Sequence, residues 1–296
     1  MTTTRDGRPS IVLDAAMSIK IARQMLTAAF QAAGCASPEI DARFLLQGVL
    51  ELTAADLLRD PDRVLGERAA LLTAWARRRL TGEPVSRILG QRDFYGRTFV
   101  ITPDVLDPRP ETETLVEAAL EIVAANGWRD RPIRIADVGT GSGILIVTLL
   151  AELPLATGIA SDVSAAALSV AKLNAGRLGV ADRVRFIETP GIGHLAGIVD
   201  LIVSNPPYIP AVSIAGLGRD VRDFDPVVAL DGGPDGLDIY RDFANDFKSL
   251  DMKALIALEI GAGQAADVDA IFTEAGARMT AQKPDLGGHI RVVIFE

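Results

Sequence analysis

The segment Asn205-Pro206-Pro207-Tyr208 combines groups that can grip a small planar substituent. The side-chain oxygen of Asn205 and the carbonyl oxygen of Pro206 are hydrogen-bond acceptors, and neither proline has an N–H that would compete for them. Two acceptors held rigidly can bind both protons of one NH2 group, and Tyr208 offers a flat ring beside it. The turn therefore predicts a site for an amine or amide nitrogen, with Pro207 stiffening it.

Such a site suits the transfer of a methyl group to a planar nitrogen. The lone pair of this nitrogen is delocalised, so drawing its protons toward acceptors is needed to aim the lone pair at a methyl donor. The attack is an in-line displacement, in which positioning and the placement of charge provide most of the catalysis. It requires neither a metal nor a strong general base. We predict Asn205, Pro206 and Tyr208 as the catalytic residues and no metal site.

A glycine-rich segment, DVGTGSG at residues 137–143, follows one apolar run and precedes another. Glycines let the backbone turn sharply and let a ligand approach closely. Asp162 ends the next apolar run, where an acid can accept both hydroxyls of a ribose. The pattern predicts a nucleoside-containing cofactor. Its predicted ligands are Gly139, Thr140, Gly141, Ser142, Gly143 and Asp162.

The spacing of these glycines decides between cofactors. The dinucleotide fingerprint is G-x-G-x-x-G, whereas this chain has G-x-G-x-G followed by Ile144, and it has no G-x-x-x-x-G-K-[ST] segment of the P-loop type. S-adenosyl-L-methionine has no pyrophosphate to cradle, and its cationic sulfonium suits an acidic site. We therefore predict S-adenosyl-L-methionine as the cofactor.

Strands of one sheet must position both segments. From about residue 132 the pattern alternates between strands and helices, which predicts an α/β fold with a mostly parallel sheet covered by helices on both faces. Ligands of such sheets bind beyond the carboxyl ends of the strands, so the glycine segment and the asparagine turn should share one cleft. The last two strands have no helix between them and should form an antiparallel hairpin. The predicted strands are residues 133–138, 157–161, 184–187, 201–204, 254–258, 278–281 and 290–295.

The remainder of the chain predicts two further parts. Apolar residues recur at helical spacing in the N-terminal third, which predicts a small helical bundle over residues 1–90. Phe94 and Phe99 flank a Tyr95-Gly96 break, which predicts a β-hairpin linker over residues 91–106. The catalytic domain is then expected over residues 107–296.

Composition excludes several classes of protein. The formal net charge of −9 argues against nucleic acid as the main partner. A single cysteine, Cys35, excludes an internal disulfide framework, and His194 and His289 lack ligand-spaced partners for a metal. The apolar run at residues 144–150 is too short for a bilayer span, and residues 1–10 lack the apolar region of a secretory signal. We expect a cytoplasmic monomer that binds no membrane.

These motifs resemble the protein-(glutamine-N5) methyltransferases that modify peptide chain release factors. The resemblance covers nearly the whole chain, and its most specific feature is PRPETE at residues 108–113 combined with the NPPY turn at residues 205–208. The NPPY turn alone is shared with DNA adenine and cytosine amino-methyltransferases. Other matching segments are Glu83-Pro84-Val85, Ile88-Leu89-Gly90, Asp225-Pro226, Asp235-Gly236-Leu237, Glu259-Ile260-Gly261 and Gln264.

The resemblance implies a Rossmann-like methyltransferase domain with a seven-stranded sheet and a helical N-terminal domain that recognises the release factor. It implies that Asn205, Pro206, Pro207 and Tyr208 hold the glutamine of the Gly-Gly-Gln motif of class I release factors, with Arg109 among the substrate-binding residues. Asn205 would also lie close to the methyl group of S-adenosyl-L-methionine.

Two departures from the family pattern concern the ligand sites. Members usually carry an Asp-Trp or similar pair that covers the adenine, whereas this chain has Thr189-Pro190, with Glu188 as the nearest candidate for a polar contact. The usual Glu-Pro pair is Asp225-Pro226 here, a mild chemical change.

Two other functions remain open at this point. The first is a DNA or RNA amino-group methyltransferase of the adenine N6 type, which the negative charge disfavours. The second is a non-catalytic S-adenosylmethionine-binding adaptor, which the intact NPPY turn disfavours.

Overall fold

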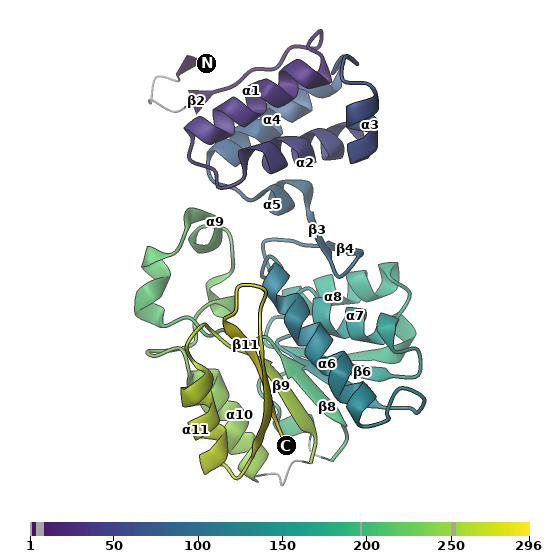
Figure 1. The fold of residues 1–296 in the computed structure, drawn as a ribbon, viewed down its shortest axis with the longest axis vertical. Helices are drawn as coiled ribbons and strands as arrows, with labels where there is room; N and C mark the ends of the chain where they lie inside the picture. The colour runs from purple at the N-terminus through teal and green to yellow at the C-terminus, as the bar shows by residue number, and fades with distance from the viewer. Residues whose placement is uncertain (1, 4–8, 196, 250–252) are drawn as a thin grey trace. The chain divides into compact units, whose positions relative to one another are not determined.

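The computed structural model describes residues 2–3, 9–195, 197–249 and 253–296. The chain forms two compact units, one of Met1–Gly90 with Arg219–Phe224 and one of Gln91–Gly218 with Asp225–Glu296 (Figure 1). In this division the hairpin of residues 91–100 lies in the second unit and residues 219–224 lie in the first, and the predicted domain boundaries stay predictions.

The first unit is a helical bundle around a core that includes Leu26, Phe30 and Leu72. Ser18 begins α1 by accepting the Ile21 N–H with its side chain, which is the usual role of a serine N-cap. The elements are β1 (Thr2–Thr3), β2 (Pro9–Ser10), α1 (Ile19–Ala32), α2 (Pro38–Leu50), α3 (Ala54–Arg59), α4 (Arg68–Leu80), α5 (Val85–Leu89) and α9 (Arg219–Arg222).

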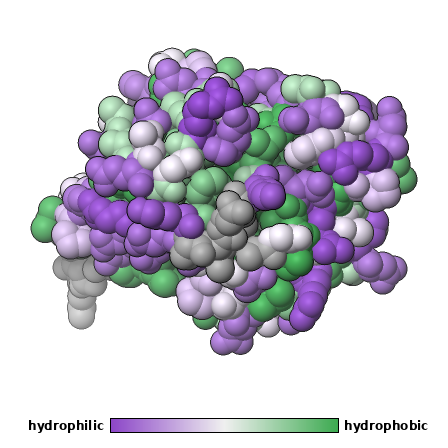
Figure 2. Space-filling view, turned by 90° about the horizontal axis from the view of Figure 1, so that it is seen from below, coloured by the Kyte–Doolittle hydropathy of each residue, from purple (hydrophilic) through white to green (hydrophobic). Residues whose placement is uncertain are grey.

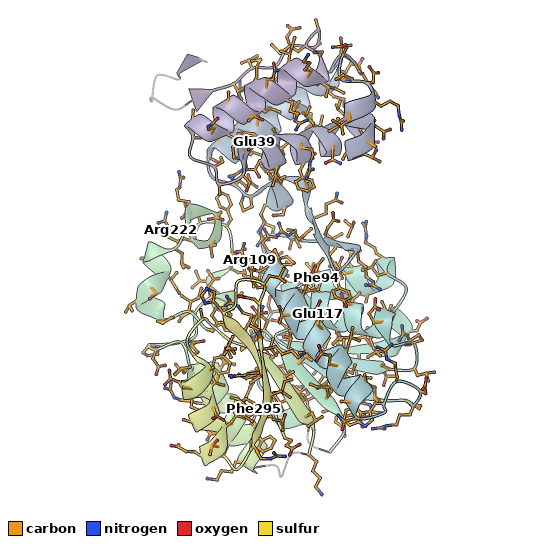
Figure 3. The ribbon with its side chains drawn as sticks, in the orientation of Figure 1. Glu39, Phe94, Arg109, Glu117, Arg222 and Phe295 are labelled. Atoms are coloured by element: carbon orange, nitrogen blue, oxygen red, sulfur yellow. The ribbon has the colours of Figure 1, made fainter. Side chains whose placement is uncertain are left out.

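The hairpin of β3 (Gln91–Phe94) and β4 (Arg97–Val100) turns at Tyr95 and Gly96, which have φ of 48° and 72°. Positive φ at both central residues is what a tight hairpin of this hand requires. Phe94 and Phe99 pack edge to face with ring centroids 6.2 Å apart and belong to the core of the second unit (Figure 3 labels Phe94). The hairpin is therefore a structural part of that unit.

The second unit contains a seven-stranded sheet in the order β10-β11-β9-β8-β5-β6-β7 (Figure 1). Strands β7, β6, β5, β8 and β9 are parallel, and β11 runs antiparallel to both β9 and β10. The predicted Rossmann-like α/β fold and its antiparallel C-terminal hairpin are thus confirmed. The strands are β5 (Arg134–Val138), β6 (Thr157–Asp162), β7 (Val184–Glu188), β8 (Leu201–Ser204), β9 (Leu255–Glu259), β10 (Met279–Pro284) and β11 (Ile290–Phe295).

Alternate residues of each strand face opposite layers of helices, as the pleat of a strand requires. Ile135 and Val203 pack with α6, α7 and α8, whereas Ala136 and Ile202 pack with α10 and α11. Figure 1 shows these two groups of helices on the two faces of the sheet. The helices are α6 (Glu113–Ala125), α7 (Ile144–Glu152), α8 (Ala165–Arg177), α10 (Asp238–Ser249) and α11 (Ala265–Glu274). Short 3-10 turns are η1 (Pro110–Thr112), η2 (Ala181–Arg183), η3 (Gly193–Leu195), η4 (Ala211–Gly216) and η5 (Val227–Ala229).

The surface seen in Figure 2 is mostly hydrophilic, with hydrophobic residues in small separate areas. Within the described segments, every helix is too short or too polar to cross a bilayer.

Candidate functional site

The site lies at the carboxyl ends of three adjacent parallel strands. The glycine loop of residues 139–143 follows β5, Asp162 ends β6, and the asparagine turn follows β8. Because β5 pairs with both β6 and β8, these segments meet at one edge of the sheet. A cavity of about 710 Å³ is lined by the glycine loop, by Asp162 and by Asn205. The predicted shared cleft is therefore present, and all of its lining belongs to the second unit.

The glycine loop adopts a conformation that side chains rarely tolerate. Gly139, Gly141 and Gly143 have φ of 70°, 54° and 83°. A Cβ on Gly143 would lie 3.1 Å from the Cβ of Ala171, so this glycine also permits the close contact between the loop and α8. These positive φ angles explain why every second residue of the loop, from 139 to 143, is a glycine.

Asp137 supports the glycine loop through hydrogen bonds. Its Oδ2 accepts the hydroxyl of Thr140 at 2.7 Å and the N–H of Ile146 at 3.2 Å, which ties the loop to the first turn of α7. Burial raises the pKa of Asp137 to about 7, while these hydrogen bonds oppose that rise. Asp137 is fully buried, so its role is to hold the loop.

Asp162 is held by two backbone groups. Its Oδ2 accepts the N–H of Gly141 at 2.9 Å, and its Oδ1 accepts the N–H of Ser164 at 2.9 Å. A carboxylate has about four acceptor positions, so each oxygen can accept one further hydrogen bond. Asp162 lines the cavity and can bind a pair of vicinal hydroxyls there.

The charge of the cavity lining is strongly negative, since five aspartates and one arginine line it. A pyrophosphate would meet repulsion in this cavity, whereas a cationic sulfonium would be attracted. The lining therefore fits S-adenosyl-L-methionine, and the contact of Asp162 with the ribose hydroxyls stays a prediction. The charged lining residues are Asp104, Arg109, Asp162, Asp231, Asp238 and Asp242.

The cavity wall after β7 is formed by Thr189, Pro190 and Gly191. The N–H of Thr189 donates to the carbonyl of Asp162 at 3.0 Å, which fixes this wall beside the end of β6. Glu188, considered above as a polar contact for the adenine, is exposed and lies outside the lining. Val163, whose relative exposure is 54%, lines the cavity and offers an apolar surface for a flat ring.

The asparagine turn begins where β8 ends. The Ser204 hydroxyl donates to the carbonyl of Val138 at 2.6 Å, which joins the ends of β8 and β5. Asn205, Pro206 and Pro207 line the cavity, and their contact with the substrate stays a prediction. Asn205 donates its Nδ2–H to the hydroxyl oxygen of Thr112 at 3.2 Å, a contact that brings η1 to the turn.

Tyr208 is placed differently from the rest of the turn. It is half-buried against the hydrophobic layer of α10 and α11 and lies outside the cavity lining. Burial raises the pKa of Tyr208 to about 12, so its hydroxyl stays protonated near neutral pH. In this structure Tyr208 anchors the turn, and its predicted contact with the substrate stays a prediction.

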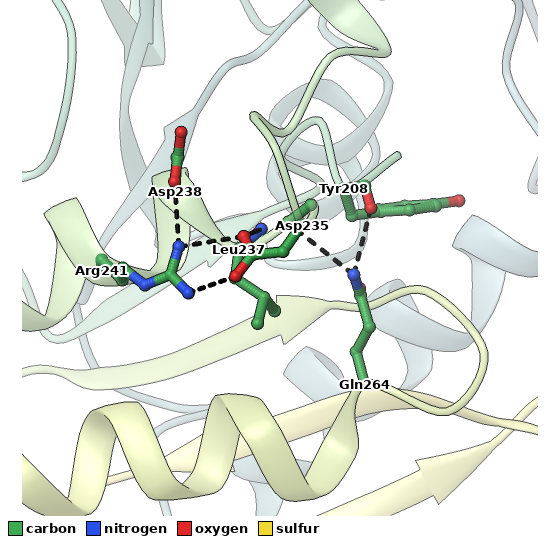
Figure 4. Close-up of polar contacts among 7 residues, drawn as sticks. Tyr208, Asp235, Leu237, Asp238, Arg241 and Gln264 are labelled. Carbon is green, nitrogen blue, oxygen red and sulfur yellow. Dashed lines mark hydrogen bonds and ion pairs between the residues drawn. The ribbon is translucent and has the colours of Figure 1, made fainter. Parts of the chain in front are cut away.

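Gln264 joins three loops around the asparagine turn, and Figure 4 shows the contacts that its Nε2 makes. Its Nε2 donates to the carbonyls of Tyr208 at 3.1 Å and Gly236 at 3.3 Å, and its Oε1 accepts the N–H of Gly261 at 2.8 Å. A Cβ on Gly236 would lie 2.4 Å from the carbonyl oxygen of Tyr208, so only glycine permits this approach. Arg241 pairs with Asp235 and holds the neighbouring loop.

Replacing Gln264 by alanine should lower the free energy of unfolding by about 1–3 kcal/mol, because three backbone groups lose a partner. The rate of methyl transfer should fall by a larger factor than the affinity for the cofactor. The reason is that the three loops joined by Gln264 support the asparagine turn and not the glycine loop. Thermal melting and calorimetric titration measure the two effects. Gln282→Ala, at an exposed position of β10, is the matched control. Equal stability of the two variants would contradict the assigned role of Gln264.

Arg109 lines the cavity but its guanidinium is paired with Asp225 (Figure 3 labels Arg109). The Asp225 side chain is only 1% exposed, and its Oδ1 also accepts the Asp107 N–H at 3.1 Å. Removing one partner of such a buried pair leaves an uncompensated charge. Arg109 therefore holds the PRPETE loop in place, whereas its predicted contact with the substrate stays a prediction.

The structure adds two residues that carried no predicted role. Thr112 is 1% exposed in η1, and Glu259 is 1% exposed at the carboxyl end of β9, beside β8. Thr112 accepts a hydrogen bond from Asn205, and the side chains of both Thr112 and Asn205 lower the pKa of the Glu259 carboxyl. The sequence contains one signal that could have identified Glu259. A carboxyl at the end of an apolar strand lies at the edge of a parallel sheet where ligands bind.

Comparisons with known proteins agree with this fold. A family model described as "Methyltransferase small domain" matches residues 117–214. The fold also resembles the catalytic domain of hMettl16, solved with the MAT2A 3′UTR hairpin 6, with a TM-score of 0.55 and 17% identity over 68% of this chain and 76% of that one. The fold and site thus define a Rossmann-like methyltransferase.

Relatives that match over most of both chains narrow the class of methyltransferase. The chain is 42% identical over 279 residues to the release factor glutamine methyltransferase of Bradyrhizobium diazoefficiens, covering 93% of this chain and 94% of the relative. It is 45% identical over 264 residues to that of Rhodospirillum rubrum, covering 88% and 80%. A family model described as "PrmC N-terminal domain" matches residues 22–90. The chain belongs to the release factor glutamine methyltransferases.

Proposed function

We propose that this enzyme transfers a methyl group from S-adenosyl-L-methionine to the side-chain nitrogen N5 of the glutamine in the Gly-Gly-Gln motif of class I peptide chain release factors. The observation that carries the proposal is the shared cavity. One acidic cavity is lined both by Asp162 with the glycine loop and by Asn205 with Pro206. A cofactor and an amide nitrogen can therefore meet there.

The residues of this chain have separable roles in that reaction. S-adenosyl-L-methionine, when bound, supplies an electrophilic methyl group on a cationic sulfonium. Gly139, Gly141 and Gly143 would let the cofactor approach the backbone, and Asp162 would accept its ribose hydroxyls. Asn205 Oδ1 and the Pro206 carbonyl oxygen would each accept a hydrogen bond from one N–H of the substrate amide. The substrate nitrogen is then oriented by two fixed acceptors, so positioning provides the rate enhancement.

Recognition of the release factor is proposed to involve residues 1–90, of which the PrmC N-terminal model matches residues 22–90. Within this unit Arg79 pairs with Asp41 at 2.7 Å, with both side chains largely buried, so this arginine serves the bundle itself. The monomeric state, the absence of direct nucleic-acid binding and the cytoplasmic location stay predictions.

Mass spectrometry of a purified release factor tests the proposal. After incubation with the enzyme and S-adenosyl-L-methionine, the peptide containing Gly-Gly-Gln should gain the mass of one methylene on its glutamine. Duplex DNA and RNA, incubated in parallel with labelled cofactor, are the competing substrates. Methylation of nucleic acid with none on the release factor would overturn the proposal in favour of an amino-group methyltransferase of nucleic acids.

A further inference from the structure

The amide of Asn205 has two ends with opposite hydrogen-bonding properties. The proposed function, on which this inference rests, uses Oδ1 as an acceptor for the substrate amide. A half-turn of the amide would present Nδ2 instead, and the two orientations have nearly the same shape. A donor at that position would repel the substrate NH2 group. Some part of the structure must therefore select the orientation.

Thr112 makes the first contact that distinguishes the two orientations. Its hydroxyl oxygen accepts from Asn205 Nδ2 at 3.2 Å. A hydroxyl has one hydrogen to donate, and Thr112 lies beside the buried carboxyl of Glu259, whose pKa it lowers. An ionised carboxyl only accepts, so Thr112 gives its hydrogen to Glu259 and can only accept from Asn205.

Glu259 makes the second contact. Its buried carboxyl lies beside the side chains of Asn205 and Thr112, which both lower its pKa, and Oε2 has no hydrogen-bond partner within the described part of the chain. In the opposite amide orientation, Asn205 Oδ1 would face this carboxyl, and two acceptors would repel each other. Both neighbours therefore favour the same orientation of the amide.

We propose that Glu259 and Thr112 are positioning residues that hold the Asn205 amide with Nδ2 turned toward them, so that Oδ1 remains free to accept the substrate. Asn205 lies in the turn after β8, Thr112 in η1 and Glu259 at the end of β9, so three segments must meet for the amide to be oriented.

Charged and titratable groups around Glu259 determine when it acts as a pure acceptor. Burial raises the pKa of Glu259 to about 7, the hydrogen bonds from Thr112 and Asn205 lower it, Arg291 lowers it and Glu111 raises it. The hydroxyls of Tyr208 and Tyr240 also face this region, and the latter donates to the Glu259 carbonyl at 2.8 Å. A protonated Glu259 can donate, so the preference for one amide orientation should weaken as pH falls.

Matched variants separate orientation from packing. Thr112→Val keeps the shape of the side chain and removes the hydroxyl, whereas Thr112→Ser keeps the hydroxyl. Glu259→Gln keeps the shape but can donate as well as accept. We expect kcat to fall about 10- to 100-fold in Thr112→Val and Glu259→Gln, the loss of one hydrogen bond to a charged network. Cofactor Kd should stay within about twofold, and Thr112→Ser should recover most of the activity. Glu274→Gln, at an exposed site at the end of α11, is the control.

The pH dependence provides a readout that a merely structural role would not change. In the wild type, kcat should fall below about pH 7 as Glu259 takes up a proton, following its raised pKa. Glu259→Gln should lose this limb of the profile. Wild-type kcat with Thr112→Val, or a Glu259→Gln profile identical to that of the wild type, would overturn the inference.

A second measurement is independent of the substrate. The side-chain amide resonance of Asn205 in NMR spectra, identified by its loss in Asn205→Asp, should titrate with Glu259 in the wild type and stay constant in Glu259→Gln. Absence of this titration in the wild type would overturn the inference even if the enzyme methylates the release factor. If the titration is present and the release factor is not methylated, the proposed function fails and the inference about Asn205 stands.

Discussion

Replacing Asn205 by alanine should lower the rate of methyl transfer to a release factor by about 100- to 1,000-fold, which is the usual cost of removing one preorganised polar group at a reacting centre. Asn205 lines the cavity at the turn after β8 and supplies one of the two proposed acceptors for the substrate amide. Without Oδ1, one proton of the substrate nitrogen has no fixed partner, so the lone pair is no longer aimed.

The cofactor should bind this variant almost as well as the wild type, because Asp162 and the glycine loop are unchanged. Single-turnover kinetics with labelled cofactor measure the rate, and calorimetry measures the affinity. Asn245→Ala, at an exposed position of α10, is the matched control and should behave as the wild type. Unchanged methylation in Asn205→Ala would show that the turn has no catalytic role.

Replacing Asp162 by alanine should raise the Kd for S-adenosyl-L-methionine by about 10- to 100-fold or more, because hydrogen bonds to a charged group contribute about 1.5–3 kcal/mol each. The structure adds a second reason for a large effect. Asp162 also accepts the backbone N–H groups of Gly141 and Ser164, so its loss disturbs the loop that approaches the cofactor.

Two further variants separate these reasons. Asp162→Asn keeps one acceptor oxygen and should bind with an affinity between those of the wild type and Asp162→Ala. Asp130→Ala, in an exposed turn, controls for the loss of one negative charge from the protein. Thermal melting without cofactor measures how much Asp162 stabilises the glycine loop. Calorimetry measures the affinity for S-adenosyl-L-methionine. A wild-type Kd in Asp162→Ala would rule out the ribose assignment.

The fold was predictable because its signals are local. Strand residues alternate between faces, so apolar runs such as Leu201–Ser204 mark buried parallel strands wherever helices lie between them. The turn at Tyr95-Gly96 and the three glycines of the cofactor loop reflect backbone angles that few residues adopt. These preferences act within a few residues, and they were sufficient to locate the strands and the cleft.

Contacts between distant segments were not predictable in the same way. Arg109 pairs with Asp225 from a loop far along the chain, and Glu188, next to the predicted cofactor wall, is exposed and lies outside the cavity lining. No local pattern carries this information, because such pairs depend on which strand ends become neighbours in the folded sheet.

The sequence by itself determined that Asn205-Pro206 and Asp162 lie at strand ends in a parallel sheet, since their types and spacing follow from backbone geometry and strand alternation. Only the tertiary structure decided what surrounds them. Glu259 and Thr112 reach Asn205 because the order of the sheet places β9 beside β8 and η1 against the turn. Once these groups are buried together, the cost of unpaired polar atoms leaves them few arrangements.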